Sequence, residues 1–168
     1  LLEKYFRGEL EQSRLAARYV GAYANKVYAP APNQKIYASY FRDGLRYFQS
    51  FSWAKGERVE GVEKQMLFEV EGKQFVGYLD LISVNDNNEI VITDHKSKDL
   101  KSREQAKKKD LQLLEENIRQ LYIYAIAVYE QYQRFPSVLR YNCFRKGVCI
   151  KEGFDVEKLE ETKKWAVT

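Results

Sequence analysis

Two carboxylates and a lysine stand on stretches of the chain that otherwise read as buried strands. Asp80 ends the sequence Gly77-Tyr-Leu-Asp80, and Asp94 and Lys96 occur one strand later in Ile92-Thr-Asp94-His95-Lys96. A lone carboxylate moved out of water loses several kcal/mol of solvation, so each one needs a compensating charge. Lys96 can compensate one carboxylate, and a divalent metal ion could satisfy both. These residue types therefore point to a site that binds a cation.

The side-chain period of a strand predicts how these groups are presented, because alternate residues share a face. The first acidic face should consist of Val76, Tyr78, Asp80, Ile82 and Val84, with Phe75, Leu79 and Leu81 on the other face. Asp94 and Lys96 should emerge together from the stripe of Ile90 and Ile92, while His95 points the other way. Both acids would then interrupt apolar faces.

Length and composition limit the class of protein. The chain has 168 residues, of which 45% are hydrophobic and 14% aromatic, enough for one domain with a substantial core. No apolar run approaches membrane-spanning length and no signal-peptide pattern opens the chain, so we expect a soluble, cytoplasmic protein. Cys143 and Cys149 are expected to be free thiols. Because the chain opens at Leu1 without an initiator Met, we also expect it to be a portion of something longer.

The positive charge of the chain is concentrated in one segment. The net charge is +4, from 28 basic and 24 acidic residues. Residues 98–109 alone carry that excess, with two acidic residues, Asp99 and Glu104, against six basic ones: Lys98, Lys101, Arg103, Lys107, Lys108 and Lys109. A charge run by itself is more often a solvated loop or helix start. Its position directly after Asp94 and Lys96 favours an interaction with nucleic acid.

Hydrophobic periodicity predicts a helical region followed by strands. Residues 1–51 read as helical, with a break at Pro30 and Pro32 and a second helix from about Gln34 to Phe51. Turn-forming residues at 71–72 and 85–88 then separate three strands of an antiparallel meander. These strands are predicted at Val62–Val70, Gln74–Val84 and Glu89–Ser97.

A long amphipathic helix is predicted after the basic segment, ending near Phe135-Pro136. Its start has two candidates. Ser102 with Gln105 has the form of a capping box, whereas the lysine run and Asp110 fit a loop that ends in a cap at 110. We favour the later start. A fourth strand is expected over Ser137–Arg145, and a closing helix over Asp155–Trp165.

This order of elements, with Asp in the second strand and Asp-x-Lys in the third, resembles the PD-(D/E)XK nuclease superfamily. Within it, Gln120-Leu-Tyr-Ile-Tyr124 is similar to the Gln-x-x-x-Tyr helix of the RecB-like exonuclease branch. The resemblance covers roughly Gly61 to Trp165 and is carried by the order and spacing of its motifs together. Three further segments look like phage and prophage nucleases of that branch: Gly61-Val-Glu63, Arg119-Gln120-Leu121-Tyr122 and Tyr141-Asn142-Cys143-Phe144.

The resemblance implies a restriction-endonuclease-like core of the α/β (α+β) class. Its central mixed sheet would contain the antiparallel three-strand meander and be flanked by helices. It implies one nuclease domain over residues 1–168, with an N-terminal helical part at 1–55 and the catalytic core at 61–168.

The resemblance also implies roles for the site residues. Asp80, Asp94 and the backbone carbonyl of His95 would hold Mg²⁺ or Mn²⁺, which prefer hard oxygen ligands. Lys96 would orient or activate the attacking water and neutralise charge on the phosphate.

Other residues would bind the substrate. Gln120 and Tyr124 lie one helical turn apart and could both face the site, although such a pair alone is more often packing. Lys98 and Lys101 of the basic segment would contact the DNA backbone.

Two further features of the family concern an additional acidic residue or histidine and an iron-sulfur cluster. Glu63 matches a glutamate that the family often has on the first strand, and plain solvent exposure would explain it equally well. The family commonly adds a histidine or glutamate from an upstream helix, so either Glu63 or a residue before Leu1 would supply it. Some members carry an iron-sulfur cluster on four cysteines, which Cys143 and Cys149 cannot form alone.

The sequence thus predicts a metal-dependent deoxyribonuclease, an exonuclease of phage recombination or repair type. An endonuclease remains an alternative within this class. The interpretation allows a homo-oligomer and a phage recombination partner protein. Two other classes stay open: a non-catalytic nucleic-acid-binding or assembly module that kept the fold, and an interaction domain in which Asp80, Asp94 and Lys96 form a structural ion-pair cluster.

Overall fold

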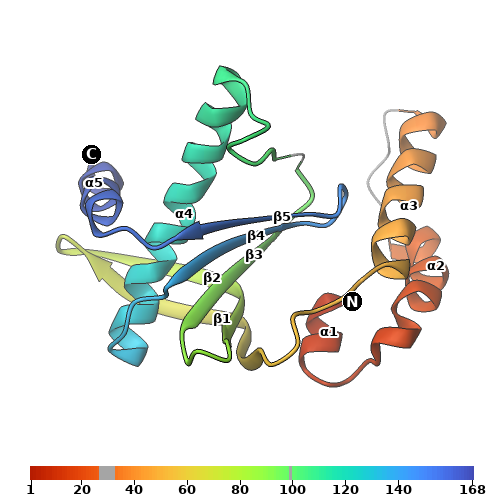
Figure 1. The fold of residues 1–168 in the computed structure, drawn as a ribbon, viewed down its shortest axis with the longest axis horizontal. Coiled ribbons are helices and arrows are strands. Elements are labelled where there is room, and N and C mark those ends of the chain that lie inside the picture. The colour runs from red at the N-terminus through yellow and green to blue at the C-terminus, as the bar shows by residue number, and fades with distance from the viewer. Residues whose placement is uncertain (27–32, 99) are drawn as a thin grey trace.

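A computed structural model describes residues 1–26, 33–98 and 100–168. At its centre lies a mixed sheet in the order β1-β2-β3-β4-β5 (Figure 1). All neighbouring strands are antiparallel except β3 and β4, which run parallel. The strands are β1 (Arg58–Val70), β2 (Lys73–Val84), β3 (Ile90–Lys96), β4 (Val138–Cys143) and β5 (Val148–Gly153).

Short turns fold the first three strands into an antiparallel meander. Glu71 and Gly72 join β1 to β2 with φ angles of 48° and 79°, in the left-handed region that a tight hairpin turn requires. In the next turn, the Asn85 side chain accepts hydrogen bonds from the backbone N–H groups of Asn87 and Glu89. The parallel pair β3 and β4 needs a crossover, and helix α4 (Lys108–Tyr132) lies within it.

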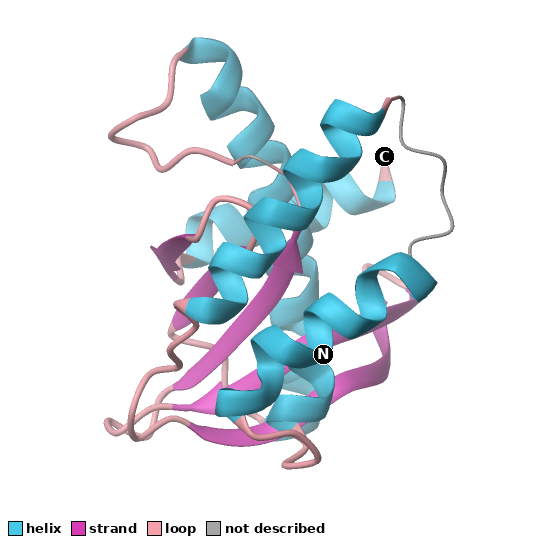
Figure 2. Ribbon diagram, turned by 90° about the vertical axis from the view of Figure 1, so that its right-hand side faces the viewer, coloured by secondary structure: helices cyan, strands magenta, loops and turns pink. Residues whose placement is uncertain are grey.

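Helices lie on both sides of the sheet (Figures 1 and 2). Helices α4 and α5 (Val156–Val167) pack on one face. The other face meets α1 (Leu2–Phe6), a short 3₁₀ turn (Gln12–Arg14), α2 (Leu15–Lys26) and α3 (Gln34–Gln49). Figure 2 shows α2 and α3 side by side, and the rings of Tyr23 and Tyr37 meet between them at a centroid distance of 5.0 Å.

Each face of the sheet has its own apolar core. The α4 face buries residues of all five strands against α4 and α5, among them Phe68, Ile92, Ile118, Tyr122 and Leu139. The opposite face buries a smaller aromatic cluster: Phe6, Leu15, Tyr47, Phe51 and Leu81. The N-terminal helices are therefore joined to the sheet through Leu81, one residue after Asp80.

The predicted fold class is confirmed, and most predicted elements occur within a few residues of their expected bounds. The later start of α4 is the better of the two candidates, but Asp110 is not the cap itself. The helix begins at Lys108, and the Asp110 carboxylate accepts a hydrogen bond from the Lys107 backbone N–H. The region predicted as Ser137–Arg145 is β4, and β5 was not predicted.

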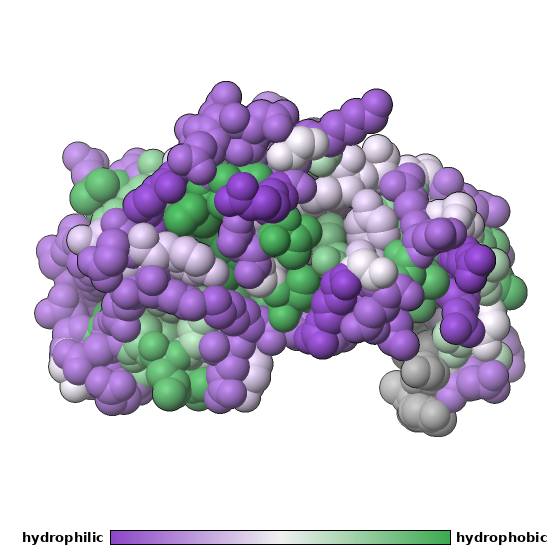
Figure 3. All heavy atoms as spheres, turned by 90° about the horizontal axis from the view of Figure 1, so that it is seen from below, coloured by the Kyte–Doolittle hydropathy of each residue, from purple (hydrophilic) through white to green (hydrophobic). Residues whose placement is uncertain are grey.

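Three residues used in the sequence analysis, Pro30, Pro32 and Asp99, lie outside the described residues. In the part of the chain that the structure describes, none of the helices combines the length and apolar character needed to cross a membrane. Figure 3 shows polar residues over most of the face seen from below, with smaller apolar areas between them.

Candidate active site

The predicted acids lie where β2 and β3 separate. The paired register of these strands runs from Val84–Ile90 to Leu81–Thr93, just before Asp80 and Asp94 would meet. Beyond that point β3 keeps its parallel pairing with β4 as far as Lys96. The His95 backbone N–H donates a hydrogen bond of 2.7 Å to Asp80 Oδ2. The Asp80 side chain thus bridges the two strands at the point where their ladder ends.

The predicted face around Asp80 is wrong, because β2 changes face at this residue. Leu79 and Ile82 both belong to the core under α4, whereas Leu81 belongs to the opposite core. Val76 and Tyr78 are 54% and 56% exposed, so they do not share a face with Ile82. A regular alternation cannot place Leu79 and Ile82 together.

An irregularity in β1 accompanies this change of face. Val62 pairs with Leu81 and Lys64 pairs with Leu79, so Glu63 lies opposite Asp80. Glu63 has a φ of +48°, which is unusual for a residue with a side chain. Left-handed backbone in a strand kinks the strand locally, as in a β-bulge. Glu63 therefore lies opposite Asp80 at the point where the alternation of β2 breaks, and a register shift of β1 lies nearby, between Val59 and Gly61.

Asp94 and Lys96 do emerge together, as predicted, because β3 is regular and paired. Asp94 is only 6% exposed. The Lys96 ammonium lies 2.9 Å from Asp94 Oδ2 and 3.1 Å from Oδ1. The same ammonium donates to Gln120 Oε1 at 2.9 Å, and it lies 5.7 Å from the centre of the Tyr141 ring. Lys96 is therefore held between an acid and an amide on α4.

The Gln120–Tyr124 pair belongs to this same hydrogen-bonded chain. Gln120 Nε2 donates to the Tyr124 hydroxyl at 2.8 Å, so its amide oxygen is directed toward Lys96. Gly77 leaves room for the tyrosine, because a Cβ at this position would lie 2.8 Å from the Tyr124 ring. The sequence Gly77-Tyr-Leu-Asp80 thus supplies both the acid and the space for the helix side chain that reaches the site.

Burial and charge oppose one another at Asp94. Burial raises the pKa of the Asp94 carboxyl, the nearby Asp80 charge raises it further, and Lys96 lowers it. Burial also raises the pKa of Tyr124, which keeps its phenol protonated as a hydrogen-bonding group. The two acids therefore repel each other across the gap between β2 and β3, which is the electrostatic setting that an added cation relieves.

A hollow of about 390 Å³ opens beside Asp80 on the α1 side of the sheet. Its lining includes Glu3, Glu63, Asp80 and His95. Burial raises the pKa of Glu63, and the charges of Asp80 and Glu3 raise it further. Glu3 was missed by the sequence analysis, since an acidic residue in a five-residue helix gives no signal of what the helix packs on. The structure places this upstream glutamate in the same hollow as Glu63 and Asp80.

The His95 ring is packed within the protein. It stacks on Phe6 at a centroid distance of 5.8 Å, and its Nδ1 lies 2.9 Å from the Asn142 amide nitrogen. Burial lowers the pKa of His95 to about 4. The ring is therefore neutral at physiological pH.

The basic segment is divided between paired and exposed residues. Lys101 forms an ion pair of 2.9 Å with Asp110, and Arg103 bridges Glu115 and Glu152 at 2.5 and 2.7 Å. These pairs fix the segment to α4 and β5. Four side chains are exposed, that of Lys98 shortly after β3 and those of Lys107, Lys108 and Lys109 at the start of α4.

The donor set fits a divalent metal held by few side chains. Among residues 1–26, 33–98 and 100–168, no group of three or more His, Cys, Asp or Glu side chains forms a metal site. Asp80 and Asp94 offer hard carboxylate oxygens, the ligands that Mg²⁺ and Mn²⁺ prefer. Burial raises the pKa of Asp94 although Lys96 lowers it, so a cation between the acids would stabilise both carboxylates in their charged form.

A five-stranded mixed sheet with helices on both faces, with Asp80, Asp94 and Lys96 at the point where β2 and β3 separate, has the architecture of the restriction-endonuclease-like fold. A sequence model of the PD-(D/E)XK nuclease superfamily matches residues 1–167, and the chain belongs to that superfamily. Among curated proteins, no significant match was found. Nucleases of this superfamily generally use divalent metal ions.

Proposed function

We propose that this protein is a Mg²⁺- or Mn²⁺-dependent deoxyribonuclease of the RecB-like branch, an exonuclease of phage recombination or repair type. The observation that carries the proposal is the position of Lys96. Its ammonium is held by Asp94 on its own strand and by Gln120 on α4. An ion pair alone would not need the amide, whereas a lysine that must keep one position beside a reacting phosphate would.

Asp80 and Asp94, together with the His95 carbonyl, are the proposed metal ligands. Bound there, the ion would supply Lewis-acid stabilisation of the charge that develops on the phosphate and a lower pKa for the attacking water. Asp80 is held in place by the His95 N–H. Glu63, on the opposite side of Asp80, is the proposed additional acid of the site, and Glu3 adjoins it across the hollow.

Lys96 would orient the attacking water and neutralise charge on the phosphate. Gln120 and Tyr124 fix Lys96 and would hold the substrate strand beside it. Lys98 and Lys101 would contact the DNA backbone. Because Lys101 is paired with Asp110, its contact would require an exchange of that ion pair for a phosphate.

The wider setting is proposed on the same basis. A cytoplasmic enzyme that acts on DNA, of the kind found among phage and prophage nucleases, fits the RecB-like resemblance. It could act as a homo-oligomer or with a phage recombination partner protein. The two cysteines again exclude an iron-sulfur cluster made by this segment alone.

The proposal is tested by incubating the full-length protein with linear double-stranded, linear single-stranded and closed circular DNA, with Mg²⁺, with Mn²⁺ or with chelator. We expect metal-dependent loss of the linear substrates, abolished by Asp94→Ala and Lys96→Ala. Degradation of closed circles would identify an endonuclease instead. DNA binding with a steep salt dependence but without cleavage in either metal would favour the non-catalytic binding module.

A further inference from the structure

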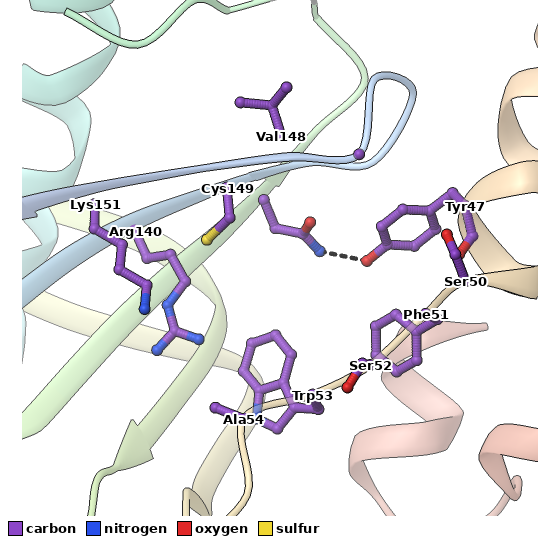
Figure 4. Close-up of a pocket in the computed structure, with 12 residues that line it drawn as sticks. Tyr47, Ser50, Phe51, Ser52, Trp53, Ala54, Arg140, Val148, Cys149 and Lys151 are labelled. Carbon is purple, nitrogen blue, oxygen red and sulfur yellow. Dashed lines mark hydrogen bonds between the residues drawn. The ribbon is translucent and has the colours of Figure 1, made fainter. Parts of the chain in front are cut away.

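A second pocket, of about 330 Å³, lies on the α3 side of the sheet (Figure 4). It is bounded by the end of α3 with the segment that follows it, residues 47–54, and by strands β4 and β5. None of its lining residues belongs to the hollow beside Asp80. The pocket is therefore separate from the candidate active site.

Two cations stand side by side in this pocket. Arg140 of β4 and Lys151 of β5 are directly paired across the strands, and Figure 4 shows both side chains on the pocket side of the sheet. Like charges at directly paired positions repel each other. Glu57 compensates Arg140 through an ion pair of 2.6 Å, but no Asp or Glu lines the pocket near Lys151. The pocket therefore has an excess of positive charge.

Two hydrogen-bond donors in this cluster also lack acceptors. Arg140 is only 3% exposed, and its buried Nε has no hydrogen-bond partner among the described residues. The same holds for the indole Nε1 of Trp53, whose ring lies 4.8 Å from the Arg140 guanidinium. Buried donors are normally paired. Arg140 Nε and Trp53 Nε1 are thus unpaired donors close to the positive charge of Lys151. An anion with several acceptor oxygens is the kind of ligand that suits this combination.

The lining and the volume of the pocket indicate which chemical group the anion belongs to. Tyr47, Phe51 and Trp53 give the pocket an aromatic side, and its volume falls within the range of about 300 to 1,000 Å³ typical of small-molecule sites. A phosphate group matches the donors, because it bears several strong acceptor oxygens and up to two negative charges. An attached organic group would lie along the aromatic side.

We propose that this pocket binds a phosphate group, free or carried by a mononucleotide. A nucleoside monophosphate would be its natural source if the proposed nuclease activity holds, since hydrolysis of DNA by an exonuclease releases mononucleotides. Binding itself does not depend on that activity. Asn142 links the pocket to the site, because its amide nitrogen donates to the Tyr47 hydroxyl and lies 2.9 Å from His95 Nδ1.

Cys149 provides a direct reporter of occupancy. It lines the pocket and is exposed, whereas Cys143, the only other cysteine of the chain, is buried. Burial raises the pKa of the Cys149 thiol, so alkylation is best followed at about pH 8.5. The rate of Cys149 alkylation by iodoacetamide is measured by mass spectrometry, without metal or DNA, in the presence of dTMP, thymidine or inorganic phosphate.

We expect dTMP to slow alkylation about tenfold at ~10 times its Kd, and thymidine to leave the rate unchanged. Phosphate alone should protect as well; stronger protection by dTMP identifies the mononucleotide as the source, and equal protection identifies free phosphate. Lys151→Gln should weaken protection, and so should Trp53→Phe, which removes the indole donor and keeps an aromatic ring at this position. Lys164→Gln on α5 should not. Each variant is compared with itself with and without ligand.

Asp94→Ala should bind dTMP like the unaltered protein, so that loss of nuclease activity and loss of this site are distinguished. The proposal is overturned if neither phosphate nor dTMP protects Cys149, or if thymidine protects equally. It is also overturned if Asp94→Ala abolishes protection, which would place the ligand at the candidate active site.

Discussion

Strand alternation predicts the position of Lys96 correctly and that of Asp80 incorrectly, because only the strand of Lys96 is regular. Its strand is regular and hydrogen-bonded to β4, so the predicted alternation holds and Lys96 shares a face with Asp94. Asp80 was identified as a candidate site residue by its type, but alternation did not predict which face of the sheet its side chain lies on. Its strand changes face opposite the left-handed backbone of Glu63, and a non-glycine residue of this kind gives no warning in the sequence.

Replacement of Asp94 distinguishes between two interpretations of this residue, a metal ligand and a member of a structural ion pair. Because burial and Asp80 both raise the pKa of the Asp94 carboxyl, its charged form is disfavoured in the folded protein without metal. We expect Asp94→Asn to be as stable as the unaltered protein, or more so, in chelator. Millimolar Mn²⁺ should raise the melting temperature of the unaltered protein but not of the variant.

The matched control is Asp155→Asn at the N-cap of α5, which should keep the Mn²⁺ response. A structural ion pair would give the opposite result for Asp94→Asn. Breaking such a pair leaves Lys96 uncompensated and would destabilise the metal-free protein by about 3 to 5 kcal/mol.

His95 should make the metal-free protein sensitive to mild acid. Burial lowers the pKa of folded His95 from its ordinary value of 6.5 to about 4, so the unfolded chain binds the proton more readily. Stability is therefore fully present above pH 6.5 and is lost as the pH falls toward 4. From pH 7 to pH 5.5 the free energy of unfolding should fall by about 1 kcal/mol because of His95. Urea unfolding in chelator measures this change. In His95→Phe, which retains an aromatic ring beside Phe6, this part of the pH dependence should disappear; an unchanged slope would contradict the assignment.

At the scale of elements, the sequence predicted those with strong periodicity and missed those without it. The meander and α4 carry long apolar patterns, and β4 carries a short alternating one; all were found. β5 is short and mixes Lys151 and Glu152 with its apolar residues, so only its pairing with β4 defines it as a strand. The position of α1 was equally hidden, since tertiary packing alone places Glu3 in the hollow with Glu63 and Asp80.

The contact between β2 and α4 should control the site through Tyr124. A Cβ at residue 77 would lie 2.8 Å from the Tyr124 ring, so Gly77→Ala must displace this ring and its bond to Gln120. We expect a loss of about 1 to 3 kcal/mol in the free energy of unfolding, typical of overpacking. At temperatures where the variant is still folded, the loss of stability alone would leave nuclease activity unchanged, and we nevertheless expect this activity to fall.

Gly153→Ala is the matched control, because residue 153 also lies in a strand and its Cβ would meet nothing within 4 Å. Chemical unfolding and cleavage assays on both variants give the comparison. Full activity of Gly77→Ala would show that the Tyr124–Gln120–Lys96 chain has no part in the reaction.

The first turn of α4 should contribute to DNA affinity through charge alone. Lys107, Lys108 and Lys109 are exposed and near the site in sequence. Replacing all three by Gln should weaken DNA binding uniformly across sequences. The slope of log K against log salt should become shallower by up to about 3, since each lost phosphate contact removes about 0.9. Fluorescence anisotropy in chelator measures this. Three lysines of α5, Lys158, Lys163 and Lys164, serve as the control for the change in net charge; identical effects of the two sets would indicate net charge rather than a DNA path.

At the scale of the whole molecule, the site lies between two cores. The α4 core fixes Asp94, Lys96 and Gln120, while the aromatic core on the opposite face fixes His95 and the hollow beside Asp80. The predicted single domain of 1–168 stays a prediction, although the N-terminal helices share a core with Leu81. The proposed centre depends on both faces of the sheet, because each face holds part of its groups.

The most direct test of that centre is the single-turnover rate of linear double-stranded DNA cleavage in Mn²⁺ for Lys96→Gln and Lys98→Gln. Lys96 is held by Asp94 and Gln120, whereas Lys98 is exposed nearby. Lys96→Gln should lower the rate by about 10²- to 10³-fold, the usual effect of removing a preorganised stabilising group. Lys98→Gln should mainly weaken DNA binding and retain the rate at saturating DNA. Cleavage by Lys96→Gln at the unaltered rate would contradict the account.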